Sequence, residues 1–353
     1  MRTFLGLAIV FLLAFSPAVA WADDVEPKDV GGKTLEQWIK EIKDKDPGVC
    51  ENAIRTVVMF GRRGAKAAPA LIDQLSHPDV SVKGNAAASL GILSQYLSAA
   101  DTERAIERLA VKMIDDRQAL VAYHSAMALY YFGNQARPVI PKLIVASRAD
   151  LTWELRRAAV MALAVAGAND GKMPHDLRAV KALVDACSDK CATVRLEAVT
   201  GLGMLGPPAI DSDRLMVLNA LKLRFKDSEE TVAIWAHAAY LFVDKMSEEH
   251  LSAIASYLKS PKLNSRFQAA KALGLIGKDA KHHVSQVVDL LKDKEPIAAY
   301  SAANALPNMG PGAAEAIPVI NELLQKKDLN EGLKTALLEC LKAIQGMKGK
   351  QVP

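Results

Sequence analysis

Residues 265–277 read SRFQAAKALGLIG, and residues 194–206 read VRLEAVTGLGMLG. The two stretches share one frame of thirteen residues, with Arg second, Ala fifth, Leu ninth, and Gly at the tenth and last positions. The frame also fits 49–61, 82–94, 121–133, 155–167, 232–244 and 298–310, and a degenerate copy lies near 332–346. Successive copies are 33 to 39 residues apart, and self-similarity at such a period is the signature of a repeat architecture.

Two positions of the frame predict its secondary structure. The fifth position is Ala in every copy except one, where it is Ser125, and the ninth is Leu in most copies. Residues four apart lie on the same face of an α-helix. A small residue lets two helices approach closely, and a large apolar residue one turn later fills the remaining space. The frame is therefore interpreted as a helix that packs on its neighbours.

A second amphipathic pattern precedes each copy of the frame. It is clear in TLEQWIKEIKD (34–44), PALIDQLSH (69–77) and HLSAIASYLKS (250–260), where apolar residues recur at intervals of three and four. The repeating unit is thus two antiparallel helices, repeated about nine times. Such pairs bury their apolar faces only by stacking. We predict an all-α, right-handed α-α superhelix (α-solenoid) over residues 34–346, with mobile segments at 23–33 and 347–353.

The frame and the turn before it resemble bacterial HEAT and PBS-lyase-HEAT-like repeats. The resemblance covers roughly 34–346, and the opening GGKTLEQWIKEIKDKDPGV (31–49) is similar to the start of exported bacterial HEAT-repeat proteins. It implies that the basic residue at the second frame position pairs with an Asp of a turn, which is a scaffolding role. Arg156, Arg195, Arg266 and Lys83 hold that position, whereas other copies have Cys or Ala there.

The first 22 residues have the pattern of a secretory signal peptide. Arg2 precedes an apolar run from Phe4 to Phe15, and the small-residue motif Ala18-Val19-Ala20 follows. A second such motif ends at Ala22, so cleavage is expected after Ala20 or Ala22. The apolar run is too short for a comfortable membrane span. We expect a periplasmic or secreted protein with no membrane span after cleavage.

Charge and cysteine content narrow the range of partners. The 44 basic and 40 acidic residues give a net charge of +4, which is not the footprint of a nucleic-acid-binding protein. Cys187 and Cys191 form a candidate disulfide, because export permits such bonds. The other interpretation is that all four cysteines, which include Cys50 and Cys340, are small buried apolar residues. Their spacing does not suit zinc.

Enzymes do occur among proteins with repeats of this class. HEAT-like iron hydroxylases carry His-Glu ligand pairs, but the sequence contains no His-Glu dipeptide, and its seven histidines share no frame position. Phycobilin lyases also use these repeats, but no chromophore site is recognisable here. We predict no catalytic residues, no metal and no cofactor, and a non-catalytic, exported scaffold for protein–protein interaction. The alternative is an accessory or catalytic subunit of an exported multi-protein system, with an unrecognised active site.

A candidate binding surface follows from the frame. Its third, seventh and tenth positions point away from the small-residue stripe, and they are more apolar and aromatic than a solvated face requires. Tyr and Arg are favoured anchors at protein interfaces. We predict that a protein or peptide binds on the concave face, in a groove lined by Tyr123, Tyr130, Arg157, Ile234, Phe267 and Tyr300. The competing interpretation is that neighbouring helix layers bury this row.

Overall fold

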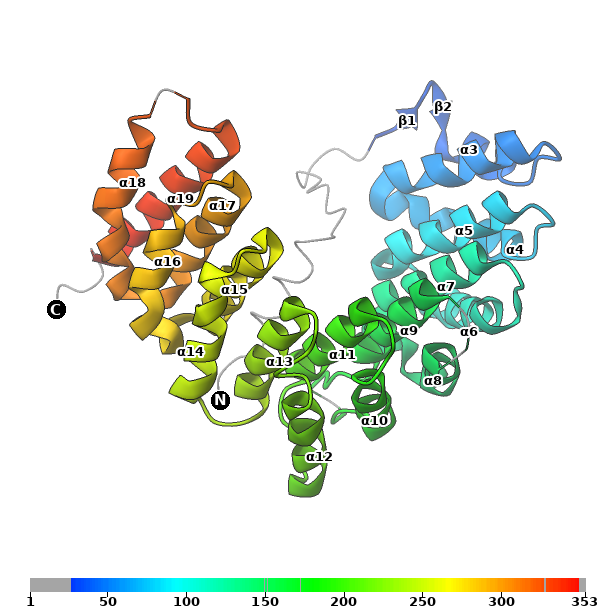
Figure 1. Ribbon diagram of the computed structural model, residues 1–353. Coiled ribbons are helices and arrows are strands. Elements are labelled where there is room, and N and C mark those ends of the chain that lie inside the picture. The colour runs from blue at the N-terminus through cyan, green and yellow to red at the C-terminus, as the bar shows by residue number, and fades with distance from the viewer. Residues whose placement is uncertain (1–26, 149, 151, 172, 327, 349–353) are drawn as a thin grey trace. The chain divides into compact units, whose positions relative to one another are not determined.

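The computed structural model describes residues 27–148, 150, 152–171, 173–326 and 328–348. The chain divides into two compact units, with the boundary between Leu205 and Gly206. Each unit is a stack of paired helices in chain order (Figure 1). The prediction of an all-α helical repeat solenoid is confirmed. The predicted signal peptide, residues 1–22, lies outside the described residues.

Unit 1 begins with a small β-hairpin and continues with helix pairs. Strand β1 (Asp29–Val30) is antiparallel to β2 (Lys33–Thr34). The helices are α2 (Leu35–Glu41), α3 (Pro47–Val57), α4 (Ala68–Gln74), α5 (Val80–Leu93), α6 (Ala99–Asp115), α7 (Ala119–Phe132), α8 (Ile140–Arg148), α9 (Trp153–Ala166), α10 (Leu177–Ala186) and α11 (Ala192–Leu205). The 3-10 helices are η1 (Val58–Ala67), η2 (Ser94–Tyr96) and η3 (Gly133–Val139).

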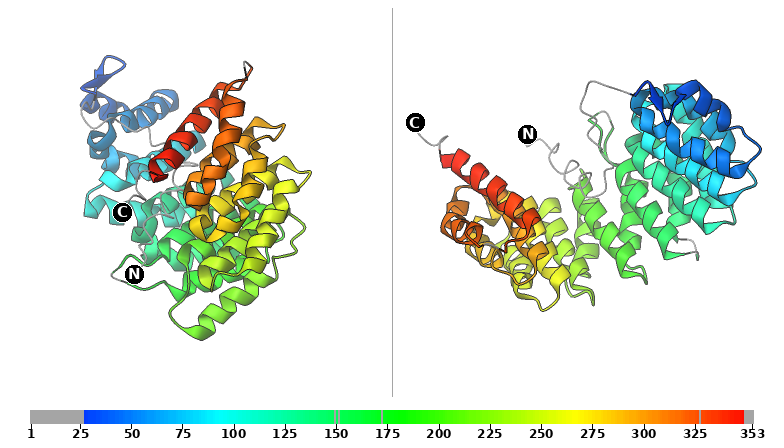
Figure 2. Two further views of the ribbon diagram at one scale, coloured as in Figure 1. Left: turned by 90° about the vertical axis from the view of Figure 1, so that its left-hand side faces the viewer. Right: turned by 90° about the horizontal axis from the view of Figure 1, so that it is seen from above.

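Unit 2 repeats the same plan. Its helices are α12 (Asp211–Lys222), α13 (Glu230–Val243), α14 (Glu248–Ser256), α15 (Leu263–Ile276), α16 (Val284–Leu290), α17 (Pro296–Ala305), α18 (Ile317–Leu324) and α19 (Glu331–Lys348). The 3-10 helices are η4 (Tyr257–Lys259), η5 (Gly277–His283), η6 (Leu306–Met309) and η7 (Pro311–Ala316). Figure 2 shows the helix pairs of each unit side by side.

The repeat frame forms one of two helix layers. In unit 1, α3, α5, α7, α9 and α11 pack in sequence, and α4, α6, α8 and α10 form the other layer. In unit 2, α13, α15, α17 and α19 are the corresponding series. All eight small residues at the fifth frame position are buried, and seven of the eight residues at the ninth position are buried. Tyr240, the exception, is half-buried.

Two glycines show how closely adjacent frame helices approach. A Cβ atom added to Gly91 of α5 would lie 2.9 Å from the Ala128 Cα atom of α7. A Cβ atom added to Gly274 of α15 would lie 2.7 Å from the Ala305 Cα atom of α17. Real Cβ atoms do not come so near, so Gly at the tenth frame position sets the spacing of the layer.

The junction after each frame helix is more regular than a simple turn. Gly61, Gly133, Gly206, Gly277 and Gly310 end their frames with positive φ, a conformation that other residues rarely adopt. After most of these glycines the chain forms a 3-10 helix before the next α-helix begins. Asp46 and Asp79 cap α3 and α5 by accepting backbone N–H groups.

The predicted terminal segments need two corrections. Residues 29–33, expected to be mobile, belong to the β-hairpin, which Trp38 fixes by donating its indole N–H to the Val30 carbonyl at 2.9 Å. Lys33 lies 4.5 Å from the centroid of the same ring and pairs with Glu41 at 2.7 Å. At the other end, α19 extends to Lys348, beyond the predicted limit of the solenoid at 346. Residues 349–353 lie outside the described residues.

Candidate protein-interaction surface

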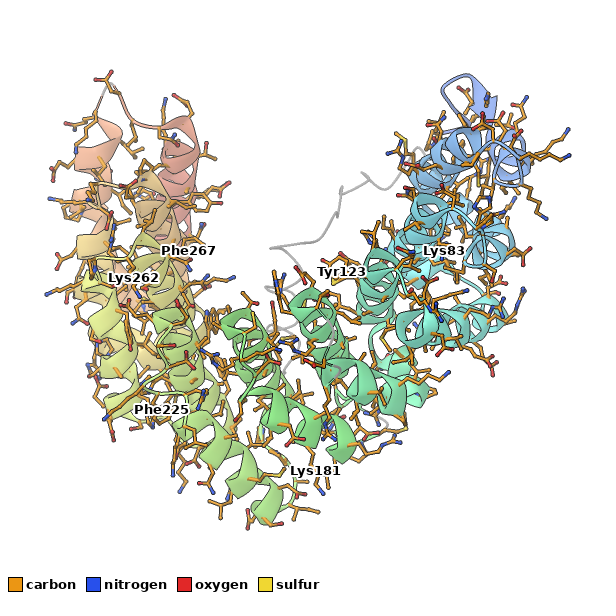
Figure 3. The ribbon with its side chains drawn as sticks, turned by 45° about the vertical axis from the view of Figure 1, so that its right-hand side comes forward. Lys83, Tyr123, Lys181, Phe225, Lys262 and Phe267 are labelled. Atoms are coloured by element: carbon orange, nitrogen blue, oxygen red, sulfur yellow. The ribbon has the colours of Figure 1, made fainter. Side chains whose placement is uncertain are left out.

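An apolar and aromatic surface lies on α7 and α9 of unit 1. We call it the α7–α9 face, and it consists of Leu120, Tyr123, Met127, Tyr130, Tyr131, Trp153, Arg157 and Met161. All are half-buried or exposed, and they recur at helical spacing on the side of each helix that does not pack into the core. Tyr123 is labelled on this surface in Figure 3.

The aromatic rings of α7 pack against one another along the helix. Tyr130 and Tyr131 meet edge to face, with ring centroids 5.4 Å apart, and Tyr123 meets His124 at the same centroid distance. Burial raises the pKa of Tyr130 and Tyr131 and lowers that of His124. Within the described part of the chain, the hydroxyls of Tyr123, Tyr130 and Tyr131 have no protein hydrogen-bond partner. Each side chain therefore combines a fixed apolar body with an available polar tip.

Arg157 of the predicted row lies on the α7–α9 face, and its guanidinium is paired within the protein. Its Nε donates to Glu197 Oε1 at 2.9 Å, and its Nη2 lies 2.8 Å from the same oxygen. This pair joins α9 to α11 at the edge of the α7–α9 face. Arg157 does line the surface, but its guanidinium is already engaged. The pair with Glu197 fixes the position of the Arg157 side chain and leaves its guanidinium less available for an ion pair with a partner.

The predicted residues of unit 2 do not form one surface. Ile234 is 0% exposed, so its assignment to a groove is wrong, whereas Tyr300 is 44% exposed and Phe267 is half-buried. All three occupy the third frame position. Ile234 is enclosed because α12, α14 and α15 pack around α13.

The candidate disulfide is absent. Cys187 and Cys191 are both thiols in the structure. Cys187 is buried at the end of α10, whereas the Cys191 Sγ lies 3.1 Å from the Thr193 hydroxyl at the start of α11. The two side chains thus belong to different environments on either side of a turn. Cys50 and Cys340 are also buried thiols, whereas Cys191 is half-buried, so the interpretation that all four are buried apolar residues holds for three of them.

Basic residues at the second frame position pair with turn aspartates, as the sequence resemblance implied. Arg156 Nε and Nη2 donate to Asp189 at 2.7 and 2.8 Å, and Arg266 binds Asp293 in the same two-bond geometry. Lys83 Nζ lies 2.6 Å from Asp116. Burial alone would raise the pKa of Asp189, but hydrogen bonds from Arg156 and from a backbone N–H outweigh it and hold that pKa below its usual value. These groups stabilise turns.

One polar cluster was not predicted from the sequence. His237 of α13 and His250 of α14 are both buried, with their Nδ1 atoms 3.0 Å apart. The sequence pattern assigned no role to either histidine. The two are thirteen residues apart on different helices, so no local motif could reveal their contact. Phe225, which stacks on His237 at a centroid distance of 4.1 Å, is labelled in Figure 3.

The described residues contain no group of three or more His, Cys, Asp and Glu side chains arranged to hold a metal ion. Over the same residues, no helix is both long and apolar enough to cross a bilayer.

Comparison with known proteins identifies the repeat. A family model described as HEAT repeats matches residues 35–130 and 140–241, which together exceed half of the chain. The chain belongs to the HEAT-repeat family. No curated protein matches the sequence.

Solved structures with related architecture share little sequence with this HEAT-repeat chain. One engineered protein is 20% identical, with a TM-score of 0.47 and coverage of 89% of this chain and 92% of its own. A second engineered protein is 19% identical, with a TM-score of 0.48 and coverage of 61% and 100%. The complex of CpcE and CpcF of phycocyanin lyase from Nostoc sp. PCC7120 is 14% identical, with a TM-score of 0.47 and coverage of 90% and 97%.

Family membership accounts for the core and the turns of this HEAT-repeat protein. It explains the buried small residues, the closely spaced glycines and the Arg156–Asp189 pair, because these set the packing of one helix pair on the next. It does not explain the α7–α9 face. HEAT repeats generally bind proteins, so an apolar surface beyond the needs of packing is the place to look for a partner.

Proposed function

We propose that this protein is a non-catalytic scaffold that binds another protein through the α7–α9 face of unit 1. The observation that carries the proposal is the row of tyrosines on α7, whose rings are packed and whose hydroxyls have no protein partner among the described residues. Tyr side chains bind with little loss of conformational entropy, because few torsions are left to fix. They offer both apolar area and a hydrogen bond.

The absence of a catalytic role is part of the proposal. Four arginine side chains of the described chain are engaged in structural contacts. Arg156 and Arg266 bind turn aspartates, Arg157 binds Glu197, and Arg137 donates to the Ala168 and Pro174 carbonyls beyond the end of α9. These arginines therefore have structural partners, and their positions do not indicate a catalytic site. Stoichiometric metal in the purified protein, or turnover in a panel of hydrolase substrates, would contradict this part.

The proposed location is the periplasm or the cell exterior. Its support is the N-terminal sequence pattern, namely Arg2, an apolar run and two small-residue cleavage motifs. Cell fractionation and N-terminal sequencing of the exported protein test it. We expect a mature chain that begins at Trp21 or Asp23. A full-length chain that stays in the cytoplasm would refute export and leave the binding proposal intact.

Site-specific photo-crosslinking tests the binding surface directly. A photoreactive amino acid replaces Met127 on the α7–α9 face and, in a matched control, Glu107 on the exposed side of α6. We expect a discrete crosslinked partner from position 127 and none from position 107. The Tyr123→Ala/Tyr130→Ala variant should lose that partner while its urea midpoint stays close to the wild-type value. Equal crosslinking at both positions would refute the surface.

A further inference from the structure

The buried histidine pair of unit 2 has a role that packing alone does not explain. His237 and His250 are 9% and 8% exposed, and their Nδ1 atoms are within hydrogen-bonding distance. Buried histidines more often bond to a carbonyl or carboxylate than to a second imidazole. A hydrogen bond between two Nδ1 atoms requires one imidazole to carry its proton on Nδ1 and the other to accept there. The contact therefore exists only while at least one ring is neutral.

Aromatic rings enclose the pair. Phe225, in the turn after α12, stacks on His237 with an interplanar angle of 11° and lies 4.9 Å from His250 between centroids. Tyr240 of α13 covers His250 at 4.5 Å. The cluster thus joins three segments, because α13 supplies one histidine, α14 the other, and the turn after α12 supplies the ring that contacts both.

The charged groups around the pair are few and mixed in sign. Lys222 of α12 lies 5.7 Å from the Tyr240 centroid and lowers the pKa of His250. Glu249 of α14 and Asp244 before it act in the opposite direction, but burial is the larger effect and leaves the pKa of His250 below its usual value. Glu248 Oε1 of α14 lies 2.8 Å from Nε2 of another histidine, His283 of η5.

We propose that His237 and His250 form an acid-sensitive latch, which holds α14 and the turn after α12 on α13 at neutral pH and releases them in mild acid. When both rings are protonated, two N–H groups face each other and no acceptor remains. Two positive charges would then lie 3.0 Å apart in an aromatic cluster, where desolvation is costly. Helix α13 loses the cover of α14 and of the turn after α12 but keeps its packing on α15, so the opening is confined to 221–256.

The pH range follows from the direction of the shift. Burial, followed by the nearby His250, lowers the pKa of His237 from 6.5 to about 4 in the folded protein. The open state therefore binds more protons than the closed state between these two values. The latch is fully closed above pH 6.5 and weakens as the pH falls toward 4. Over this range the equilibrium constant for closing falls by up to about 300-fold. This inference does not depend on the proposed binding function.

Hydrogen–deuterium exchange of the full chain tests the latch. Exchange is measured at about pH 7 and about pH 4.5 and corrected for intrinsic rates. We expect protection of amides in 221–256 to fall by tenfold or more in acid, while that of α3 in unit 1, which contains no histidine, does not change. In His237→Asn/His250→Asn, amide groups that do not titrate replace the Nδ1 contacts, and the acid response should disappear. His282→Asn, at an exposed histidine of η5, should behave like the wild type.

Unchanged wild-type protection of 221–256 between the two pH values would overturn the proposal. So would a double variant that keeps the full acid response. A nitrogen-15 NMR titration of the wild-type imidazoles covers the case in which the double variant does not fold. We expect one ring of the pair to carry its proton on Nδ1 at neutral pH, with both midpoints well below 6.5. Ordinary midpoints near 6.5 for both rings would also overturn it.

Discussion

Helices α9 of unit 1 and α13 of unit 2 are copies of one frame, yet different polar chemistry secures them. At the second frame position α9 has Arg156, which forms a two-bond ion pair with Asp189, whereas α13 has Ala233. The polar anchor of α13 comes instead from the sixth position, where His237 meets His250. One anchor is a buried pair of opposite charges, and the other is a pair of neutral rings.

This contrast shows that the repeat constrains its packing more strictly than its polar contacts. Both helices bury the small residue at the fifth frame position, Ala159 in α9 and Ala236 in α13, because each must fit the same spacing between layers. The polar anchor only has to satisfy its own hydrogen bonds. The two units should therefore respond differently to acid and to the loss of one side chain.

The largest effect is expected from breaking the ion pair of α9. Arg156→Met leaves the half-buried Asp189 without the two hydrogen bonds from Arg156, and we expect a cost of about 3 kcal/mol, the lower end for a broken buried ion pair. Urea denaturation followed by circular dichroism measures it. Arg148→Met is the matched control, because its pair with Asp185 is largely exposed and is worth less than about 1 kcal/mol. A similarly small decrease in the free energy of unfolding for both variants would show that the stability of α9 does not depend on the Arg156–Asp189 pair.

Acid should separate the two anchors. The His237 pair loses stability as the pH falls from 6.5 to about 4, by about 3 kcal/mol in total. Asp189 has a pKa below its usual 3.8, so its contribution is present above 3.8 and is lost only as the pH falls through the lower folded value. Residue-resolved exchange in α13 and α9 measures this order. Simultaneous loss of protection in both helices at pH 5 would contradict it.

The close helix packing should be equally strict in both units. Gly274→Ala places a Cβ 2.7 Å from the Ala305 Cα, and we expect a cost of about 1–3 kcal/mol. Gly91→Ala in α5 should behave similarly. Gly346→Ala is the control in α19, where no atom lies within 4 Å, and it should stabilise by up to about 1 kcal/mol. Thermal unfolding measures the stability of all three variants. Unchanged stability of Gly274→Ala would mean that α15 and α17 can move apart to accommodate the added methyl group.

The smallest effect concerns thiol reactivity. Burial would raise the pKa of Cys191, but hydrogen bonds from the Thr193 side chain and from two backbone N–H groups at the start of α11 outweigh it, so the pKa falls below its usual value. Burial raises the pKa of Cys340 in unit 2 to about 12. Cys191 should react with iodoacetamide roughly tenfold faster or more. Labelling of Cys191 that requires prior reduction would contradict the unbridged thiol.

Much of the architecture could be predicted from the pattern of residues alone. The spacing of Ala53 and Val57, repeated through the chain, predicted helices, their buried face and their stacking, because one local periodicity is enough to define each. The pairing of Arg156 with a turn aspartate followed from the resemblance of the frame. Surface exposure was harder to predict. Ile234 and Tyr300 share a frame position, but one is enclosed and the other is exposed, because exposure depends on how the neighbouring helices pack around each copy of the frame.

The repeat, the helix pairs and the small-residue core were therefore encoded locally, since each of these depends on residues three or four apart. Tertiary packing, in contrast, determined which surface is apolar and accessible, and that Phe225, His237 and His250 meet. Those contacts join separate segments of the chain, and their distances depend on how whole helices pack. No local pattern encodes such distances, so the acid-sensitive anchor of unit 2 became visible only in three dimensions.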